Sequence, residues 1–202
     1  MPAAPAAFTP PILFKEEAVR ELCRLARQGY DVRHKRETFG FLYGIIDAER
    51  RLTVRHARYY RGGTKTRYRV TLDEREMQKR RRELAAELHG RFLGSFHSHV
   101  EVGGFISRGM SADDRHSFRQ DEDALIELLV SVWAGRRKSL RPTPKTIIAW
   151  EPGGLRGPTP ETADRPDPSR GYNYRIRVYV RQNGGVRRVR VRVIRSGVII
   201  VY

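Results

Sequence analysis

The spacing of apolar residues along this chain predicts helices and strands in alternation. Ala18, Leu22, Leu25 and Ala26 recur every three or four residues, which predicts a helix over Phe14–Gly29. Shorter runs rich in aromatic and branched residues have the period of strands. Strands are predicted at Glu37–Ile46, Leu52–Tyr60, Arg67–Leu72, Arg91–Phe96, Leu125–Trp133 and Thr146–Trp150, and further helices at Glu74–Leu88 and Ala112–Gln120. This order of elements is typical of the α/β class.

The C-terminal part of the chain, residues 172–202, alternates apolar residues with arginines. Arg175–Val178 and Arg188–Val193 both have strand period, and the turn sequence Asn183-Gly184-Gly185 between them predicts a β-hairpin. One face of this hairpin is expected to be apolar and packed, and the other to carry arginine. Residues 151–170 are rich in proline, glycine and aspartate without periodicity, which predicts a long loop.

Length and composition predict one domain over residues 11–202, preceded by a disordered tail at residues 1–10. With 202 residues and 39% hydrophobic content, the chain can bury a substantial core. No apolar stretch is long enough to cross a bilayer. The single cysteine, Cys23, lies in an apolar helical pattern and excludes an intrachain disulfide, which favours a reducing, cytoplasmic location.

The chain carries a formal net charge of +17, and no acidic residue follows Asp167. The C-terminal arginines are therefore either a solvated strand face or a docking surface for an anionic partner. That partner is either an acidic protein or the backbone of a nucleic acid, although no nucleic-acid-binding motif with interleaved aromatic residues is present.

His97-Ser98-His99 follows an apolar strand and is the strongest candidate for chemistry. Side chains two residues apart in a strand point to the same face, roughly 6.5–7 Å apart along the chain. Two imidazoles placed so can bind one metal ion at about 2.0–2.1 Å, or they can be ordinary polar surface. A catalytic zinc takes three protein ligands, and Asp114 is the candidate for the third, with the neighbouring Asp113 as the alternative.

Ser111-Ala112-Asp113-Asp114 also has a second interpretation, which is compatible with the first. Serine followed three residues later by an acid is the pattern of a helix-capping box. A helix that begins near Ala112 places Asp114 in its first turn, where the positive end of the helix dipole favours a carboxylate.

Upstream, Glu37 begins a strand that carries glycines at Gly40 and Gly44. In this order the glutamate, His97-Ser98-His99 and Ser111-x-x-Asp114 resemble the JAMM or MPN-type zinc metalloprotease family. The signature of that family is a glutamate before a glycine-bearing strand, then His-Ser/Thr-His-Pro, then Ser-x-x-Asp. The resemblance covers roughly Glu37 to Trp150 and is that of a prokaryotic-like, single-domain member. It implies a three-layer α/β/α, cytidine-deaminase-like fold with a mixed sheet.

The resemblance also implies roles for individual residues. His97, His99 and Asp114 are the implied ligands of one Zn²⁺ ion, Glu37 the general acid/base, and Ser111 the residue that stabilises the oxyanion. The implied reaction is hydrolysis of an amide bond by a zinc-activated water, with Glu37 moving the proton. By analogy, the substrate is a ubiquitin-like protein joined through its C-terminal glycine.

This chain departs from the family pattern beside the second histidine. Val100 stands where the family has proline, and the loop from His99 to Ser111 is longer than the pattern requires. At the usual spacing the third ligand would be Met110, a poor zinc ligand. We therefore expect an expanded, glycine-rich loop at residues 101–109 beside the site.

The sequence leaves two other functions open. The first is a catalytically inactive MPN-fold scaffold whose basic face binds nucleic acid or an acidic partner. The second is a DNA-repair-associated relative of the same fold, which differs in the residues between its histidines.

Overall fold

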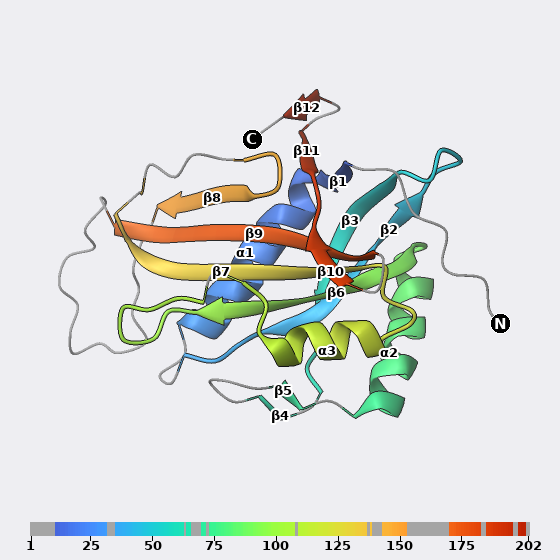
Figure 1. Ribbon diagram of the computed structural model, residues 1–202, viewed down its shortest axis with the longest axis horizontal. Coiled ribbons are helices and arrows are strands. Elements are labelled where there is room, and N and C mark those ends of the chain that lie inside the picture. Colours follow the sequence, from blue (N-terminus) through green and yellow to red (C-terminus); the bar gives the residue numbers. More distant parts are fainter. Residues whose placement is uncertain are drawn as a thin grey trace.

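A ten-stranded mixed β-sheet organises the described part of the chain (Figure 1). The computed structural model describes residues 11–31, 35–62, 64–65, 70–71, 73–107, 109–136, 138, 143–152, 170–182, 185–195 and 198–200. The predicted tail at residues 1–10 lies outside these residues, and so do residues 153–169 of the predicted loop.

The helices and strands follow the predicted order closely. In chain order they are β1 (Ile12–Lys15), α1 (Glu16–Tyr30), β2 (Phe39–Ile46), β3 (Leu52–Tyr59), β4 (Thr64–Lys65), β5 (Val70–Thr71), α2 (Glu74–Glu87), β6 (Arg91–Val100), α3 (Ala112–Gln120), β7 (Ile126–Arg136), β8 (Ile147–Pro152), β9 (Arg170–Gln182), β10 (Gly185–Arg188), β11 (Val191–Arg195) and β12 (Val198–Ile200). Of the predicted strand Arg67–Leu72, the structure describes only β5. No helix among these elements is long and apolar enough to cross a membrane.

The strands of the large sheet lie in the order β10-β9-β7-β6-β2-β3-β1-β11-β12, and β8 pairs with β9. β6 runs parallel to β7, and β1 runs parallel to both β3 and β11. The other pairs of this sheet are antiparallel. The predicted α/β class with a mixed sheet is therefore confirmed.

The sheet is nearly closed, which the sequence did not predict. β10 and β11 are consecutive in the chain but lie near opposite ends of the strand order. The prediction of Arg188–Val193 as one strand was wrong. Only Arg188 belongs to β10, which pairs with β9. The remainder becomes β11, whose Val191 and Val193 lie beside Ile12 and Phe14 of β1. Pairing with β1 satisfies backbone groups at that edge and buries apolar side chains from both strands.

One helix covers one face of the sheet. α1 packs against β1, β3, β6, β7 and β11, so the curled sheet wraps around it, and Figure 1 shows α1 passing behind β7 and β9. Ala18, Leu22, Leu25 and Ala26 are all buried in this core, as their spacing predicts. The helix begins two residues later than predicted, because the backbone of Phe14 is held in the sheet between β3 and β11.

The other face of the sheet carries α2 and α3. Leu84 of α2 packs with Phe41 and Tyr43 of β2, and Phe118 of α3 packs with Leu129 of β7. α2 is highly charged, yet its apolar residues contact the sheet as the sequence predicts. The two helices thus lie on the same side of β6, opposite α1.

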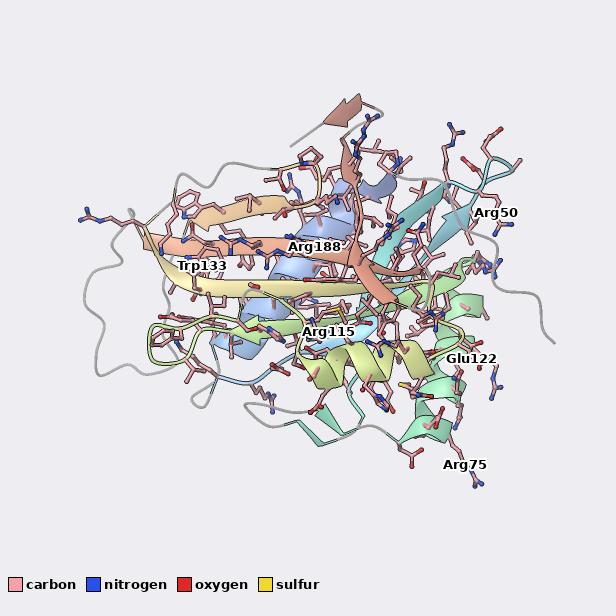
Figure 2. The ribbon with its side chains drawn as sticks, viewed as in Figure 1. Arg50, Arg75, Arg115, Glu122, Trp133 and Arg188 are labelled. Carbon is pink, nitrogen blue, oxygen red and sulfur yellow. The ribbon has the colours of Figure 1, made fainter. Side chains whose placement is uncertain are left out.

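Three arginines of β9 do not lie on a solvated face, namely Arg175, Arg177 and Arg181. This corrects the expectation of a solvated arginine face for that part of the strand. Arg177 is buried, and the guanidinium of Arg175 lies over the ring of Trp133, 5.6 Å from its centroid. Arg181 donates hydrogen bonds to the backbone carbonyls of Phe118, Asp121 and Ala124, which end α3 and lead into β7. These arginines therefore contact other parts of the protein rather than face solvent. In and after β10, four arginines are exposed: Arg187, Arg188, Arg190 and Arg192. Figure 2 labels Arg188.

β6 lies at the centre of the sheet and continues through both histidines. Its Phe96 and Val100 face the α1 core, so the alternating residues Ser95, His97 and His99 face α2 and α3. Gly94 has φ +154°, and a Cβ there would lie 1.8 Å from the carbonyl oxygen of Ile126. This close approach of β6 to β7 requires glycine.

Replacing Phe96 by alanine tests the central role of β6. Phe96 is completely buried, so Phe96→Ala is expected to lower the free energy of unfolding by about 3–5 kcal/mol. Phe105 is 85% exposed, and Phe105→Ala is expected to change the free energy by less than about 0.5 kcal/mol. Urea denaturation followed by circular dichroism measures both, and equal effects would contradict the assignment of Phe96 to the core.

Candidate metal centre

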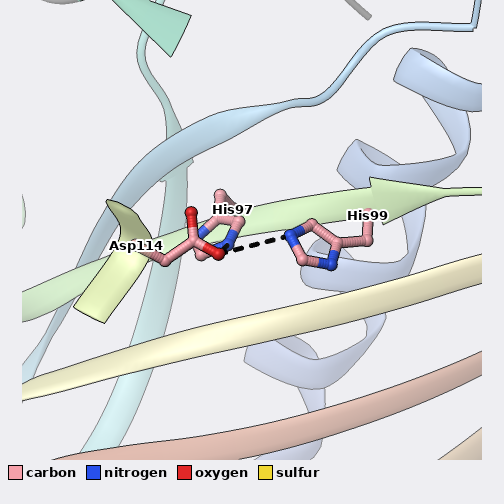
Figure 3. A group of neighbouring side chains, drawn as sticks. All are labelled: His97, His99 and Asp114. Carbon is pink, nitrogen blue, oxygen red and sulfur yellow. Dashed lines mark ion pairs between the residues drawn. The ribbon is translucent and has the colours of Figure 1, made fainter. Parts of the chain in front are cut away.

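Two histidines and one aspartate converge on the α2 and α3 side of β6 (Figure 3). The Nε2 atom of His97 lies 3.5 Å from Oδ2 of Asp114, and that of His99 lies 3.6 Å from the same oxygen. Both histidines are buried, and one potential ligand atom from each of the three residues lies within 4.8 Å of the others. This group could hold a metal ion.

Asp114 reaches the histidines because of how α3 begins. Ser111 is the N-cap residue, and its Oγ accepts a hydrogen bond of 3.0 Å from the backbone N–H of Asp114. In return, the N–H of Ser111 donates to Asp114 Oδ2 at 2.6 Å, which completes a capping box. The carboxylate that caps the helix is the one that faces both imidazoles. Asp113 is exposed and stands outside this group.

Glu37 approaches the histidines through the pairing of two backbone segments. The N–H and the hydroxyl of Thr38 both donate to the Oγ of Ser98 at 2.9 Å, and the N–H of Ser98 donates to the carbonyl of Thr38. Ser98 is fully buried on the α1 side of β6, opposite the histidines. From that face its hydroxyl holds the backbone at Thr38, the residue after Glu37. Glu37 Oε1 consequently lies 3.8 Å from Nε2 of His99.

A second set of contacts ties the same two segments together beyond the site. The hydroxyl of Tyr30 donates to Glu101 Oε2 at 2.9 Å and accepts a hydrogen bond of 2.9 Å from Lys35 Nζ. Lys35 also donates to the backbone carbonyl of Glu101 at 3.2 Å. The residues just before Glu37 and just after His99 are thereby held at a fixed separation.

Glu127 is a residue of the site that the sequence analysis missed. It lies on β7, and its Oε1 is 2.8 Å from Nδ1 of His97. Its Oε2 accepts a hydrogen bond of 2.5 Å from Ser95. The sequence does contain a signal for this residue, because Glu127 is a carboxylate in a strand that is otherwise apolar. A buried carboxylate needs hydrogen-bonding or charged partners.

The electrostatics of the group differ from residue to residue. Burial lowers the pKa of His97, but the carboxylates of Asp114 and Glu127 outweigh this effect and raise the pKa to about 10. Burial acts to raise the pKa of Asp114, yet the two histidines and the N–H of Ser111 bring it well below its ordinary value. Burial raises the pKa of Glu37, against the opposing effect of both histidines. Without metal, the site holds a proton on His97 between two carboxylates.

The geometry and chemistry of these residues fit a tetrahedral metal ion. Ligand atoms about 2.0–2.1 Å from a tetrahedral ion are about 3.3 Å apart, close to the separations between Asp114 and the two imidazoles. Nε2 of His97 is buried and has no hydrogen-bond partner within the described residues. Two imidazoles and one carboxylate are a common ligand set of catalytic zinc.

A groove of about 600 Å³ opens beside the three residues. Glu37, His97, Ser111 and Asp114 line it at one place. From there it extends along residues of α2 and α3: Glu74, Met77, Arg81, Asp113, His116, Ser117, Phe118 and Gln120. Two of the three predicted metal ligands, His97 and Asp114, therefore line one groove together with the predicted acid/base Glu37.

Residues 102–105, in the loop between His99 and Ser111, form a compact turn. Val102 and Phe105 exchange two backbone hydrogen bonds, of 2.9 and 3.0 Å, across Gly103 and Gly104. Both glycines have positive φ, 58° and 81°, which the turn requires. Met110 is buried against the core of α3 and β7, away from the group of potential ligands.

No profile of a known protein family matches this chain, and no curated protein sequence matches it. Among solved structures, the chain is similar to the solution structure of protein DSY2949 from Desulfitobacterium hafniense. The two share 17% identity with a TM-score of 0.49, over 91% of this chain and 92% of the other. A similarity of this size supports no inference about function.

The proton on His97 predicts how the stability of the metal-free protein depends on pH. Because the pKa is raised from 6.5 to about 10 on folding, the contribution of His97 to stability is complete below pH 6.5 and is lost as the pH rises through 10. Urea denaturation in the presence of a chelator measures this for the wild type and for His97→Gln. The difference in free energy of unfolding between the two is expected to shrink from pH 7 to pH 10. A difference that stays constant or grows would contradict the raised pKa.

Proposed function

We propose that this chain is a zinc-dependent metallopeptidase or isopeptidase of the JAMM type, with the MPN variant of the cytidine-deaminase-like α/β/α fold. The observation that carries the proposal is the convergence of His97, His99 and Asp114 beside Glu37. A groove opens next to this group and is lined by His97, Asp114 and Glu37. The positions of the helices, with α1 on one face of the sheet and α2 and α3 on the other, support the fold.

His97 and His99 would hold the ion through Nε2, and Asp114 through Oδ2. A zinc ion bound there supplies a Lewis acid that polarises a carbonyl and lowers the pKa of water to about 7. His97 on β6 and Asp114 in the first turn of α3 line the groove. A substrate amide in the groove would therefore lie beside His97 and Asp114.

Glu37 is the residue that moves the proton. Its carboxylate is close to His99 and lines the groove, where it would accept a proton at Oε1 and donate it to the leaving amine. Burial raises its pKa, so it holds a proton more readily than an ordinary glutamate at neutral pH. This property suits a group that must act first as a base and then as an acid.

Ser111 is placed to act on the developing negative charge. Its Oγ accepts the N–H of Asp114, which leaves its own proton free to donate into the groove that it lines. A hydroxyl donor at this position would stabilise the tetrahedral oxyanion.

The proposed substrate is an amide bond at the C-terminal glycine of a ubiquitin-like protein, as the motif resemblance implies. The volume of the groove is within the usual range for ligand sites, about 300–1,000 Å³, and is sufficient for an extended segment of a few residues.

Elemental analysis tests the metal site. We expect about one zinc ion per chain in the wild type and its loss in His97→Ala, His99→Ala and Asp114→Ala, because each variant removes one of three ligands. His116→Ala and Asp113→Ala are matched controls, since both residues line the groove but lie outside the group of ligands. Zinc that is lost in Asp113→Ala and retained in Asp114→Ala would contradict the assignment of the third ligand.

Glu37→Gln tests the chemistry. The variant is expected to retain zinc and to lose activity by at least about 10²-fold, because the amide has the shape of the acid but cannot accept the proton. The assay is hydrolysis of a fluorogenic amide at the C-terminal glycine of a ubiquitin-like protein, with and without chelator. Activity that is unchanged in Glu37→Gln would overturn the role of Glu37.

The alternative function is a scaffold protein that binds nucleic acid or an acidic partner through its basic face. Arg187, Arg188, Arg190 and Arg192 are exposed at and after β10, which favours a partner of this kind. Wild-type protein that takes up no zinc after reconstitution, but binds a polyanion tightly at low salt, would support the scaffold and refute the hydrolase.

A further inference from the structure

We propose that Glu127 is a positioning residue that orients His97 toward the metal. The inference rests on the proposed metal site and adds to it a residue that does not touch the metal. Glu127 is 5% exposed, and it lies on a strand adjacent to the histidine strand rather than on a segment that carries a ligand.

The register of β6 and β7 places Glu127 for this contact. Ser95 is the partner of Glu127 across the two parallel strands, and His97 lies two residues further along the same face of β6. The Glu127 carboxylate spans these two neighbours, with one oxygen on Nδ1 of His97 and the other on the hydroxyl of Ser95. Because both oxygens are engaged, the side chain is held in one orientation.

This contact decides which nitrogen of His97 binds a metal. A carboxylate 2.8 Å from Nδ1 requires that Nδ1 carry the proton, so in the neutral imidazole the lone pair is on Nε2. Nε2 is the atom that faces Asp114 and has no hydrogen-bond partner within the described residues. The hydrogen bond from Nδ1 also fixes the plane of the ring, as outer partners of metal-binding histidines commonly do.

His99 has no comparable support. Its Nδ1 atom is buried and has no hydrogen-bond partner in the described part of the structure. The two histidines are therefore not equivalent. A carboxylate accepts a hydrogen bond from Nδ1 of His97, whereas the polar contacts of His99 are those of its Nε2 with Asp114 and Glu37.

A contribution to stability alone does not account for the buried carboxylate of Glu127. Burying a carboxylate in an apolar strand costs free energy that a hydrophobic residue would not cost, so stability alone does not explain Glu127. The orientation of a ligand nitrogen does explain it, because that function needs an acceptor at this position.

Metal affinity measured by competition with a chromogenic chelator tests the proposal. Glu127→Gln keeps the size of the side chain and is expected to weaken zinc binding about 10- to 100-fold, the usual effect of losing an outer hydrogen-bond partner. Ser95→Ala, which frees one carboxylate oxygen, is expected to weaken binding by less. Glu74→Gln is the matched control, because Glu74 also lines the groove but contacts neither histidine in the described residues.

Two readouts separate positioning from a structural role. The visible absorption spectrum of the Co²⁺-loaded protein reports ligand geometry, and we expect it to change in Glu127→Gln but not in Glu74→Gln. The far-ultraviolet circular dichroism of the chelated variants is expected to match that of the wild type.

The outcomes distinguish this inference from the proposed function. Wild-type affinity and an unaltered Co²⁺ spectrum in Glu127→Gln would overturn the role of Glu127, even if the protein is a zinc hydrolase. Weakened zinc binding with an altered spectrum would support the role of Glu127, even if the wild type cleaves no amide. Failure of the wild type to bind either metal would overturn both.

Discussion

The candidate metal centre depends on β6 being paired along both edges. Pairing with β2 on one edge brings Glu37 to the histidines, and pairing with β7 on the other brings Glu127. The alternation of side chains in β6 then sends Ser95, His97 and His99 to one face while Phe96 and Val100 anchor the strand in the core. A shift of either register by one residue would separate these groups, so the core that fixes β6 also fixes the site.

The charges of the centre contrast with those of the whole chain. The chain has a formal net charge of +17, yet the histidines face carboxylates from three directions: Glu37, Asp114 and Glu127. Without metal, a proton on His97 offsets part of this negative charge. A metal ion at this group would compete with that proton for the same nitrogen, so its binding would release a proton and become stronger as the pH rises.

The sequence predicted much of the fold and which residues gather at the candidate site, but not the residues that support them. The spacing of Ala18, Leu22 and Leu25 predicted the buried face of α1, and the Ser111 and Asp114 pattern predicted the capping box that the structure shows. These are local signals. The support from Ser98 and Glu127 depends on strand pairs formed by residues far apart in the chain, and local periodicity carries no information about such partners.

The partnership of β1 and β11 has a consequence for folding. Ile12 and Val191 are neighbours in the sheet, although nearly the whole chain separates them in sequence. During synthesis one edge of β1 stays unpaired until β11 has left the ribosome. Contacts between residues so far apart in the chain also form slowly. Until then, β1 presents unpaired backbone groups beside apolar side chains, a combination that promotes aggregation. Yield in a recombinant host is therefore expected to be sensitive to temperature and to chaperones, even for a variant whose folded state is as stable as that of the wild type.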